Sequence, residues 1–205
     1  MAQHADVIEN PLSGERITIH QTAGETGGAL LGWELVLSAG GKVPSSHAHP
    51  RQEELFTVVE GRMRFRVGGR TVTAGPGETV RVPPGAVHHF ANPGPQAARV
   101  AVETRPALDM QALLETAAAL ASAQAAAGRR LPRPADLALF MRDFEREVRA
   151  PYLPAPLVRV VTRTIAWLAA RNGAEGRYRC LRQHPTQPLP RGRAYERDMA
   201  GDAGR

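Results

Sequence analysis

Short stretches of alternating apolar and polar residues occupy the first half of the chain. Residues 16–20, 33–37 and 62–67 alternate in this way, which is typical of β-strands with one buried face. In 62–67 the three arginines are expected to face water and the three apolar side chains to face inward. Turn signals rich in Gly and Pro separate the segments. Many short strands with regular turns predict a β-sandwich or barrel.

From about residue 106 the apolar period lengthens to that of a helix. Three amphipathic helices are expected, over 108–127, 135–149 and 157–171, with Gly and Pro between them. We expect their apolar faces to pack on the barrel or on a partner subunit. An alternative for the third helix, apolar on one side and basic on the other, is contact with an anionic membrane surface, which we regard as the weaker interpretation.

These patterns divide the chain into three parts. Residues 1–105 are expected to form the barrel, and residues 106–182 the helical extension. Residues 183–205 are rich in Pro, Gly and Arg without an apolar period. Such a segment cannot bury enough apolar surface to fold, so a disordered tail is expected there.

Charge and composition narrow the function classes. The net charge of +6 arises in the C-terminal third, where most arginines lie. Few aromatic residues accompany them, so nucleic-acid binding is not expected. The chain has a single cysteine, so an internal disulfide is excluded; with no apparent secretion signal, a cytoplasmic location is expected.

Four residues in the barrel segment carry the candidate chemistry. His47 and His49 are two residues apart, so on a strand both imidazoles can reach one point. Glu54 follows five residues later, and His88 stands after a Pro-Pro-Gly turn. Three imidazoles and one carboxylate suit one divalent transition metal ion (Fe, Mn, Ni, Cu, Co or Zn) and fit Ca or Mg poorly. The ligand set does not choose among these metals.

The two blocks resemble the motifs of the cupin superfamily. The first, G-x5-H-x-H-x4-E-x6-G, runs from Gly41 to Gly61, and the second, G-x5-P-x-G-x2-H-x3-N, runs from Gly77 to Asn92. The resemblance covers roughly residues 20–104. It implies a mainly-β cupin double-stranded β-helix (jelly-roll barrel), here with a C-terminal α-helical extension. It also implies that His47, His49, Glu54 and His88 are metal ligands and that the protein is a homodimer.

Some assignments around this site stay open. Glu53 could replace Glu54 as the carboxylate ligand, although the spacing to Gly61 favours Glu54. Glu103 and Arg99 are candidates for supporting the ligands. If the histidines face inward, four apolar side chains line the cavity beside the metal or simply fill the core. These candidate pocket residues are Phe56, Met63, Phe65 and Phe90.

Three functions remain in view. The first is a metal-dependent dioxygenase that acts on a small aromatic or enol substrate, with Glu54 as ligand or as catalytic base. The second is a non-redox cupin enzyme such as an isomerase, lyase or cyclase. The third is a module that binds a small ligand without catalysis. Because fold does not fix function, the resemblance does not decide among them.

Overall fold

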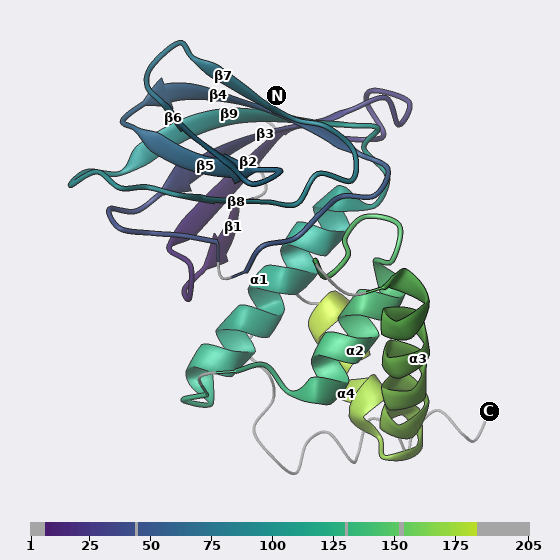
Figure 1. Cartoon of the computed structure of the whole chain (residues 1–205). Coiled ribbons are helices and arrows are strands. Elements are labelled where there is room, and N and C mark those ends of the chain that lie inside the picture. Colours follow the sequence, from purple (N-terminus) through teal and green to yellow (C-terminus); the bar gives the residue numbers. More distant parts are fainter. Residues whose placement is uncertain (1–6, 44, 130, 152–153, 184–205) are drawn as a thin grey trace.

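A computed structural model describes residues 7–43, 45–129, 131–151 and 154–183 of the chain. Strands occupy the first half and helices the second (Figure 1). The strands are β1 (Val7–Asn10), β2 (Glu15–Gln21), β3 (Leu31–Leu37), β4 (Glu53–Glu60), β5 (Met63–Val67), β6 (Arg70–Ala74), β7 (Thr79–Val82), β8 (His88–Ala91) and β9 (Ala98–Arg105). The helices are α1 (Met110–Ala126), α2 (Pro134–Asp143), α3 (Ala155–Arg171) and α4 (Ala174–Gln183).

The strands form two antiparallel sheets that enclose the core. The larger sheet has the order β1-β2-β3-β9-β4-β7, and the smaller has the order β6-β5-β8. Alternate residues point inward, as period-two patterning requires. In β3 the inward positions include Leu31 and Trp33, and in β5 they are Met63 and Phe65. The arginines of β5 are exposed, as the sequence predicts.

A segment without a strand label extends the small sheet beyond β8. Lys42 bridges to Ala91 and His47 bridges to His88, both antiparallel. His47 and His88 exchange both backbone hydrogen bonds, with N···O distances of 3.1 and 2.8 Å. Because these bonds fix the register, the first two candidate histidines are held directly beside the third.

The helical extension packs against the barrel instead of standing apart from it. In Figure 1, α1 runs diagonally below the barrel, and α2, α3 and α4 lie side by side beyond it. Met110 and Leu113 of α1 belong to the same buried cluster as the barrel strands, and so do Phe144 and Val148 after α2. A second small cluster, which includes Leu139 and Tyr178, holds α2, α3 and α4 together.

Two of the helix predictions need correction. The second helix was expected to reach Arg149, but α2 ends at Asp143. The apolar period continues through Phe144 and Val148 because both side chains are buried in the barrel cluster, and not because the helix goes on. The fourth helix, α4, was not predicted, since its sequence is strongly polar and only Tyr178 and Leu181 are buried. The expected tail, 183–205, lies outside the described residues apart from Gln183.

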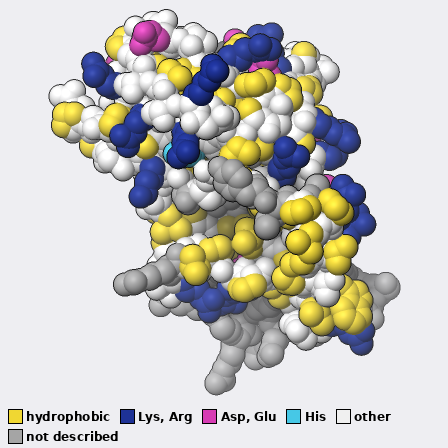
Figure 2. All heavy atoms as spheres, viewed as in Figure 1, with side chains coloured by type: hydrophobic (Ala, Val, Ile, Leu, Met, Phe, Trp, Pro, Cys, Tyr) yellow, Lys and Arg dark blue, Asp and Glu magenta, His cyan; other side chains and the backbone are white. Residues whose placement is uncertain are grey.

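The apolar side of α3 is largely exposed. Its packed positions include the small residues Ala166 and Ala169, whereas its large apolar side chains are exposed. In Figure 2 hydrophobic side chains gather on the lower right, where Figure 1 places α3. The exposed residues are Leu157, Val160, Val161, Trp167 and Leu168. Within the described ranges, no helix combines the length and hydropathy needed to cross a membrane.

Candidate metal centre

Three histidines converge at the edge of the small sheet. A potential ligand nitrogen from each of His47, His49 and His88 lies within 4.8 Å of the other two. The ring centroids are 5.0, 4.4 and 5.2 Å apart. The bridge between His47 and His88 sets two rings side by side, and the alternation of the strand brings His49 to the same face. His89 instead has its Nδ1 3.1 Å from the Ser46 hydroxyl oxygen.

Each of these three rings has its Nδ1 beside a backbone carbonyl. The acceptors are Ser45 O at 3.2 Å for His47, Glu147 O at 2.6 Å for His49, and Ala86 O at 3.1 Å for His88. A carbonyl accepts only, so each neutral ring carries its proton on Nδ1, and Nε2 is left with a free lone pair. This is the arrangement in which an imidazole binds a metal through Nε2.

The Nε2 atom of His88 supplies a test of whether a metal fits. It is buried and makes no hydrogen bond among the described residues; Glu54 Oε2 lies 3.2 Å away, but an unprotonated nitrogen and a carboxylate oxygen are both acceptors. A buried polar atom without a partner costs free energy, so such an atom needs an explanation. A metal ion held by the three Nε2 atoms would explain this unpartnered nitrogen. The donor set of three nitrogens and a carboxylate suits a transition metal.

Glu54 completes the cluster with a buried carboxylate. Its Oε2 lies 3.4 Å from His49 Nε2 and 3.2 Å from His88 Nε2. The side chain is 4% exposed, which is unusual for a carboxylate unless it is paired or binds a cation. Glu53 points the other way and pairs with Arg81 on the exposed face. The structure therefore brings Glu54, and not Glu53, to the histidines.

The electrostatics of the cluster favour the metal-binding protonation states. Burial, together with the neighbouring His88 and His49, lowers the pKa of His47 to about 3. Burial alone would raise the pKa of Glu54, but His49, His88 and His47 outweigh it and lower that pKa to about 2. At neutral pH the site therefore presents a neutral His47 imidazole and an ionised carboxylate, as metal ligation requires.

The group that holds Glu54 in place was missed at the sequence level. Thr104, on β9, lies opposite Glu54 in the sheet register and is fully buried. Its hydroxyl is 3.5 Å from Glu54 Oε1 and accepts a hydrogen bond of 3.1 Å from the Trp33 indole N–H. Alternation along β9 places Glu103, the neighbour of Thr104, on the outer face. Knowing which residues of β9 point inward would have been enough to identify Thr104.

The two support candidates named from the sequence do not contact the cluster. Glu103 pairs with Arg105 at 2.6 Å on the outer face of the sheet. Arg99 pairs with Glu34 at 3.2 Å and with Glu60 at 2.5 Å. Both residues therefore stabilise the outside of the barrel, and their expected supporting role is wrong.

The four candidate pocket residues lie in the barrel core. Phe56, Phe65 and Phe90 form a three-ring cluster, with centroids 5.3, 5.4 and 6.0 Å apart. Met63 is fully buried in the same core. Phe56 and Phe90 each stand two residues beyond a candidate ligand on the same face of β4 and β8. The interior beside the histidines is thus apolar and aromatic, and whether it admits a substrate stays a prediction.

Motif residues that bear no ligand atom shape the backbone around the site. Gly61, Gly77 and Gly85 all have positive φ, at 78°, 83° and 78°. Asn92 is buried, and its amide nitrogen donates to the carbonyls of Leu37, Ser38 and Gln96 at 2.7–3.1 Å. These residues tie the loops at the ends of β3, β7 and β8, which positions the ligands indirectly.

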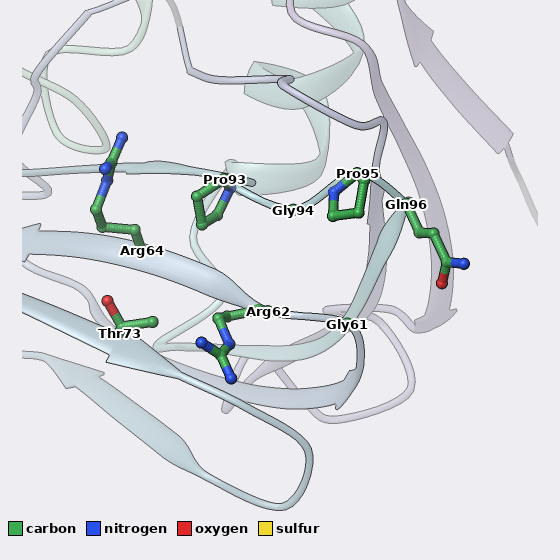
Figure 3. A pocket seen from close by; sticks show the side chains of 8 residues that line it. All are labelled: Gly61, Arg62, Arg64, Thr73, Pro93, Gly94, Pro95 and Gln96. Atoms are coloured by element: carbon green, nitrogen blue, oxygen red, sulfur yellow. The ribbon is translucent and has the colours of Figure 1, made fainter.

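A separate surface cleft lies away from this cluster. It has a volume of about 590 Å³ and runs between the β4–β5 corner, the outer face of β5 and the loop after Asn92 (Figure 3). Arg62 and Arg64 line it together with Thr73 and the segment 93–96. None of the four candidate ligands belongs to its lining, so the cleft is not the candidate metal centre.

Comparisons with known proteins identify the barrel. The family model described as Cupin domain matches residues 33–103. No curated protein matches the chain. Residues 33–103 therefore match a cupin domain, and the expected fold class, a mainly-β cupin barrel with a helical extension, is confirmed.

Solved structures with similar folds share little sequence with the chain. An RmlC-like cupin from Shewanella frigidimarina NCIMB 400 is 19% identical over 54% of this chain and 92% of that one, with a TM-score of 0.46. The cupin domain of Schizosaccharomyces pombe Cnp3 is 14% identical over 50% and 69%, with a TM-score of 0.43. A structure from Silicibacter pomeroyi described as a sugar phosphate isomerase from a cupin superfamily is 22% identical over 46% and 60%, with a TM-score of 0.39.

Proposed function

We propose that the chain is a metal-dependent cupin enzyme that holds one divalent transition metal ion through His47, His49, Glu54 and His88. The observation that carries this proposal is the convergence of three imidazoles whose Nδ1 atoms all face backbone carbonyls, beside a buried carboxylate. That arrangement orients each Nε2 toward one point and leaves it unprotonated. The metal is one of Fe, Mn, Ni, Cu, Co and Zn.

The reaction proposed is dioxygenation of a small aromatic or enol substrate. The bound ion would supply Lewis acidity and, if redox-active, electron transfer to O₂. Both oxygen atoms then enter the substrate, so no separate reductant is needed. The apolar interior formed by Phe56, Phe65 and Phe90 supports this substrate class, since aromatic rings pack favourably against such side chains.

Glu54 is better suited to be a ligand than a catalytic base. Its pKa of about 2 keeps the carboxylate ionised at neutral pH. A general base works best with a pKa near the working pH, and a carboxylate this acidic is a weak proton acceptor. Its proposed part is therefore to neutralise the ion and, with Oε1 near Thr104, to hold one orientation.

Metal analysis of the purified protein and of three variants tests this assignment. His49→Ala and His88→Ala each remove one proposed ligand, so the metal content should fall from near one ion per chain to a small fraction. His89→Ala is the matched control, because His89 is adjacent but bonds Ser46 instead. It should keep the wild-type content. Full retention of metal in both ligand variants would overturn the assignment.

Oxygen uptake separates the dioxygenase from the other functions. Wild-type protein that contains Fe, Mn, Ni or Cu should consume O₂ when a member of a panel of small aromatic and enol compounds is added. Turnover that persists without air, or with zinc as the bound metal, would show that the protein is a non-redox enzyme and not a dioxygenase. Stabilisation by a compound without any turnover would indicate a binding module.

A further inference from the structure

The segment that follows α2 returns to the barrel beside the candidate metal centre. We call residues 144–149 the strap. In Figure 1 the green chain rises from the upper end of α2 to the underside of the barrel before α3 begins. Residue 149 then forms an antiparallel bridge with Ala48, the residue between the two histidines His47 and His49.

Backbone hydrogen bonds fix this contact. The Arg149 N–H donates to Ala48 O at 2.9 Å, and the Ala48 N–H donates to Arg149 O at 3.3 Å. Because alternate residues of an extended segment bond to opposite edges, Ala48 bonds to the strap while His47 bonds to β8. The segment that bears His47 and His49 is thus held between β8 and the strap.

The strap also bonds directly to a candidate ligand. The backbone carbonyl of Glu147 accepts the Nδ1–H of His49 at 2.6 Å, the shortest of the three such bonds in the cluster. For His47 and His88 the accepting carbonyl lies only two residues away along the chain, in Ser45 and Ala86. For His49 it lies 98 residues away, in the helical extension. His49 alone depends on that extension for its orientation.

Both flanks of the strap are anchored. The side chains of Phe144 and Val148 are buried in the barrel core. Glu147 is 1% exposed, and its Oε1 lies 3.4 Å from the backbone N–H of Asp109, directly before α1. The Glu147 side chain therefore connects the strap to the start of α1, while its carbonyl holds His49.

We infer that the strap is a positioning element for His49, and that metal binding and seating of the strap are thermodynamically coupled. The inference rests on the metal site proposed above. When the strap is seated, His49 is fixed in the tautomer and orientation that present Nε2. By reciprocity, an ion bound at Nε2 strengthens the seating of the strap by the same factor. The helical extension is then part of the metal centre and not an appendage.

Two substitutions at one position test the coupling. Arg149→Pro removes the amide that donates to Ala48, while Arg149→Ala keeps that amide and removes only the guanidinium, which is 3.4 Å from Gly85 O. The affinity of each metal-free full-length variant for Zn²⁺ is measured by competition with a chelating dye. When the strap loses its seat, His49 loses the Glu147 carbonyl, and loss of such an outer hydrogen-bonding partner of a ligand weakens metal binding by about 10–100-fold. Arg149→Pro should show this loss, and Arg149→Ala should stay close to wild type.

A measurement on the wild-type protein does not depend on any variant folding. Amide hydrogen exchange at Ala48 and Arg149 should slow more when Zn²⁺ is added than exchange at amides of β2, which lies far along the sheet order from the site and reports only the overall gain in stability. The imidazole ¹⁵N signal of His49 reports the Nδ1 hydrogen bond, and it should shift in Arg149→Pro even without metal.

The outcomes distinguish the two proposals. Wild-type protein that binds none of the six metals contradicts the proposed function. Wild-type protein that binds Zn²⁺, with exchange at Ala48 and Arg149 slowed no more than in β2, overturns the coupling and leaves the metal site intact. Equal Zn²⁺ affinity in folded Arg149→Pro and Arg149→Ala overturns it as well.

Discussion

Single residues at the candidate metal centre are held by hydrogen bonds that leave little rotational freedom. Each histidine has its Nδ1 bonded to a carbonyl, and Glu54 has one oxygen facing histidines and the other facing Thr104. Preorganisation of this kind reduces the entropy lost when a ligand binds. Substitutions that leave the four ligands unchanged can therefore still affect the site.

Thr104 provides such a case. Thr104→Val keeps the shape of the side chain but leaves the buried Trp33 indole N–H without its acceptor and frees Glu54 Oε1. An unsatisfied buried polar group costs about 1–3 kcal/mol. We expect urea denaturation to show a decrease in the free energy of unfolding within that range. Thr104→Ser, which keeps the hydroxyl, is the control; equal losses in both variants would show that the methyl group, and not the hydroxyl, matters.

Acid should destabilise the metal-free protein through the same cluster. The pKa of His47 is lowered from 6.5 to about 3 and that of Glu54 from 4.5 to about 2. Between the folded and unfolded values the unfolded chain binds more protons, so the free energy of unfolding falls as the pH falls. For His47 this loss runs from about pH 6.5 down to 3, and for Glu54 from about pH 4.5 down to 2.

Urea midpoints of metal-free protein at pH 7, 5.5 and 4 measure this effect. We expect the midpoint to decrease at each step, and His47→Gln, which cannot be protonated, to decrease less between pH 7 and 5.5. A wild-type midpoint that is flat or higher at pH 5.5 would contradict the lowered pKa of His47.

At the residue level, the sequence predicts what lies at fixed spacing and misses what depends on strand facing. The two motifs identify the histidines and Glu54, because their spacing reflects a turn and a register that are local. Thr104 carries no such signal: it is one polar residue on a strand whose inward positions were not decided, and Glu103 was named instead. The partner of His49 is a backbone carbonyl in Glu147, which no side-chain pattern can indicate.

At the level of elements, tight glycine turns set the register of the hairpins. Gly61 and Gly77 both have positive φ, at 78° and 83°. A Cβ on Gly61 would lie 2.9 Å from Ala98 Cα, whereas a Cβ on Gly77 would meet nothing within 4 Å. The two glycines therefore share a conformational requirement, but only Gly61 also has a packing requirement.

This difference predicts unequal effects of one substitution. Gly77→Ala should cost about 1–2 kcal/mol, since an L-residue is disfavoured in the left-handed region by that amount. Gly61→Ala should cost about 1–3 kcal/mol more, because the β4–β5 corner must move away from β9 to make room. Chemical denaturation of both variants gives the comparison, and a Gly61→Ala variant no less stable than Gly77→Ala would contradict the close approach of Gly61 to Ala98.

The helices show where element prediction from periodicity stops. The apolar period that predicted a helix to Arg149 is real, but Phe144 and Val148 reach the barrel from an irregular segment. Tertiary packing thus overrides helix propensity at this point. In α4 the ion pair of Arg177 with Asp136 at 2.5 Å supplements the few buried side chains, and a pairing so distant in the sequence leaves no periodic pattern.

At the scale of the whole molecule, α1 and the strap of the extension are built into the core of the barrel, while α2, α3 and α4 also share a second cluster. Met110 and Leu113 from α1 and Phe144 and Val148 from the strap belong to the cluster that includes Trp33 of the barrel. Elements that share buried contacts tend to unfold together. The two parts are therefore expected to lose structure in a single transition, although the sequence divides them at about residue 105.

Two probes can follow the two parts separately. The chain has two tryptophans; Trp167 is 57% exposed and Trp33 is 5% exposed. In Trp167→Phe the fluorescence reports the barrel alone, and far-ultraviolet circular dichroism at 222 nm reports mainly the helices. We expect coincident denaturation curves. Loss of the helical signal at lower denaturant would show that the extension folds as a separate unit.

The distance along the chain between His49 and the carbonyl of Glu147 affects the order of events during synthesis. The last barrel strand ends at Arg105, well before the strap leaves the ribosome. At about 5–20 residues per second, residue 149 follows Arg105 along the growing chain by about 2–9 s. During that interval His49 lacks its distant partner while its other neighbours are already in place. Tight binding of the ion is therefore expected only after the strap has been synthesised and has taken its place beside His49.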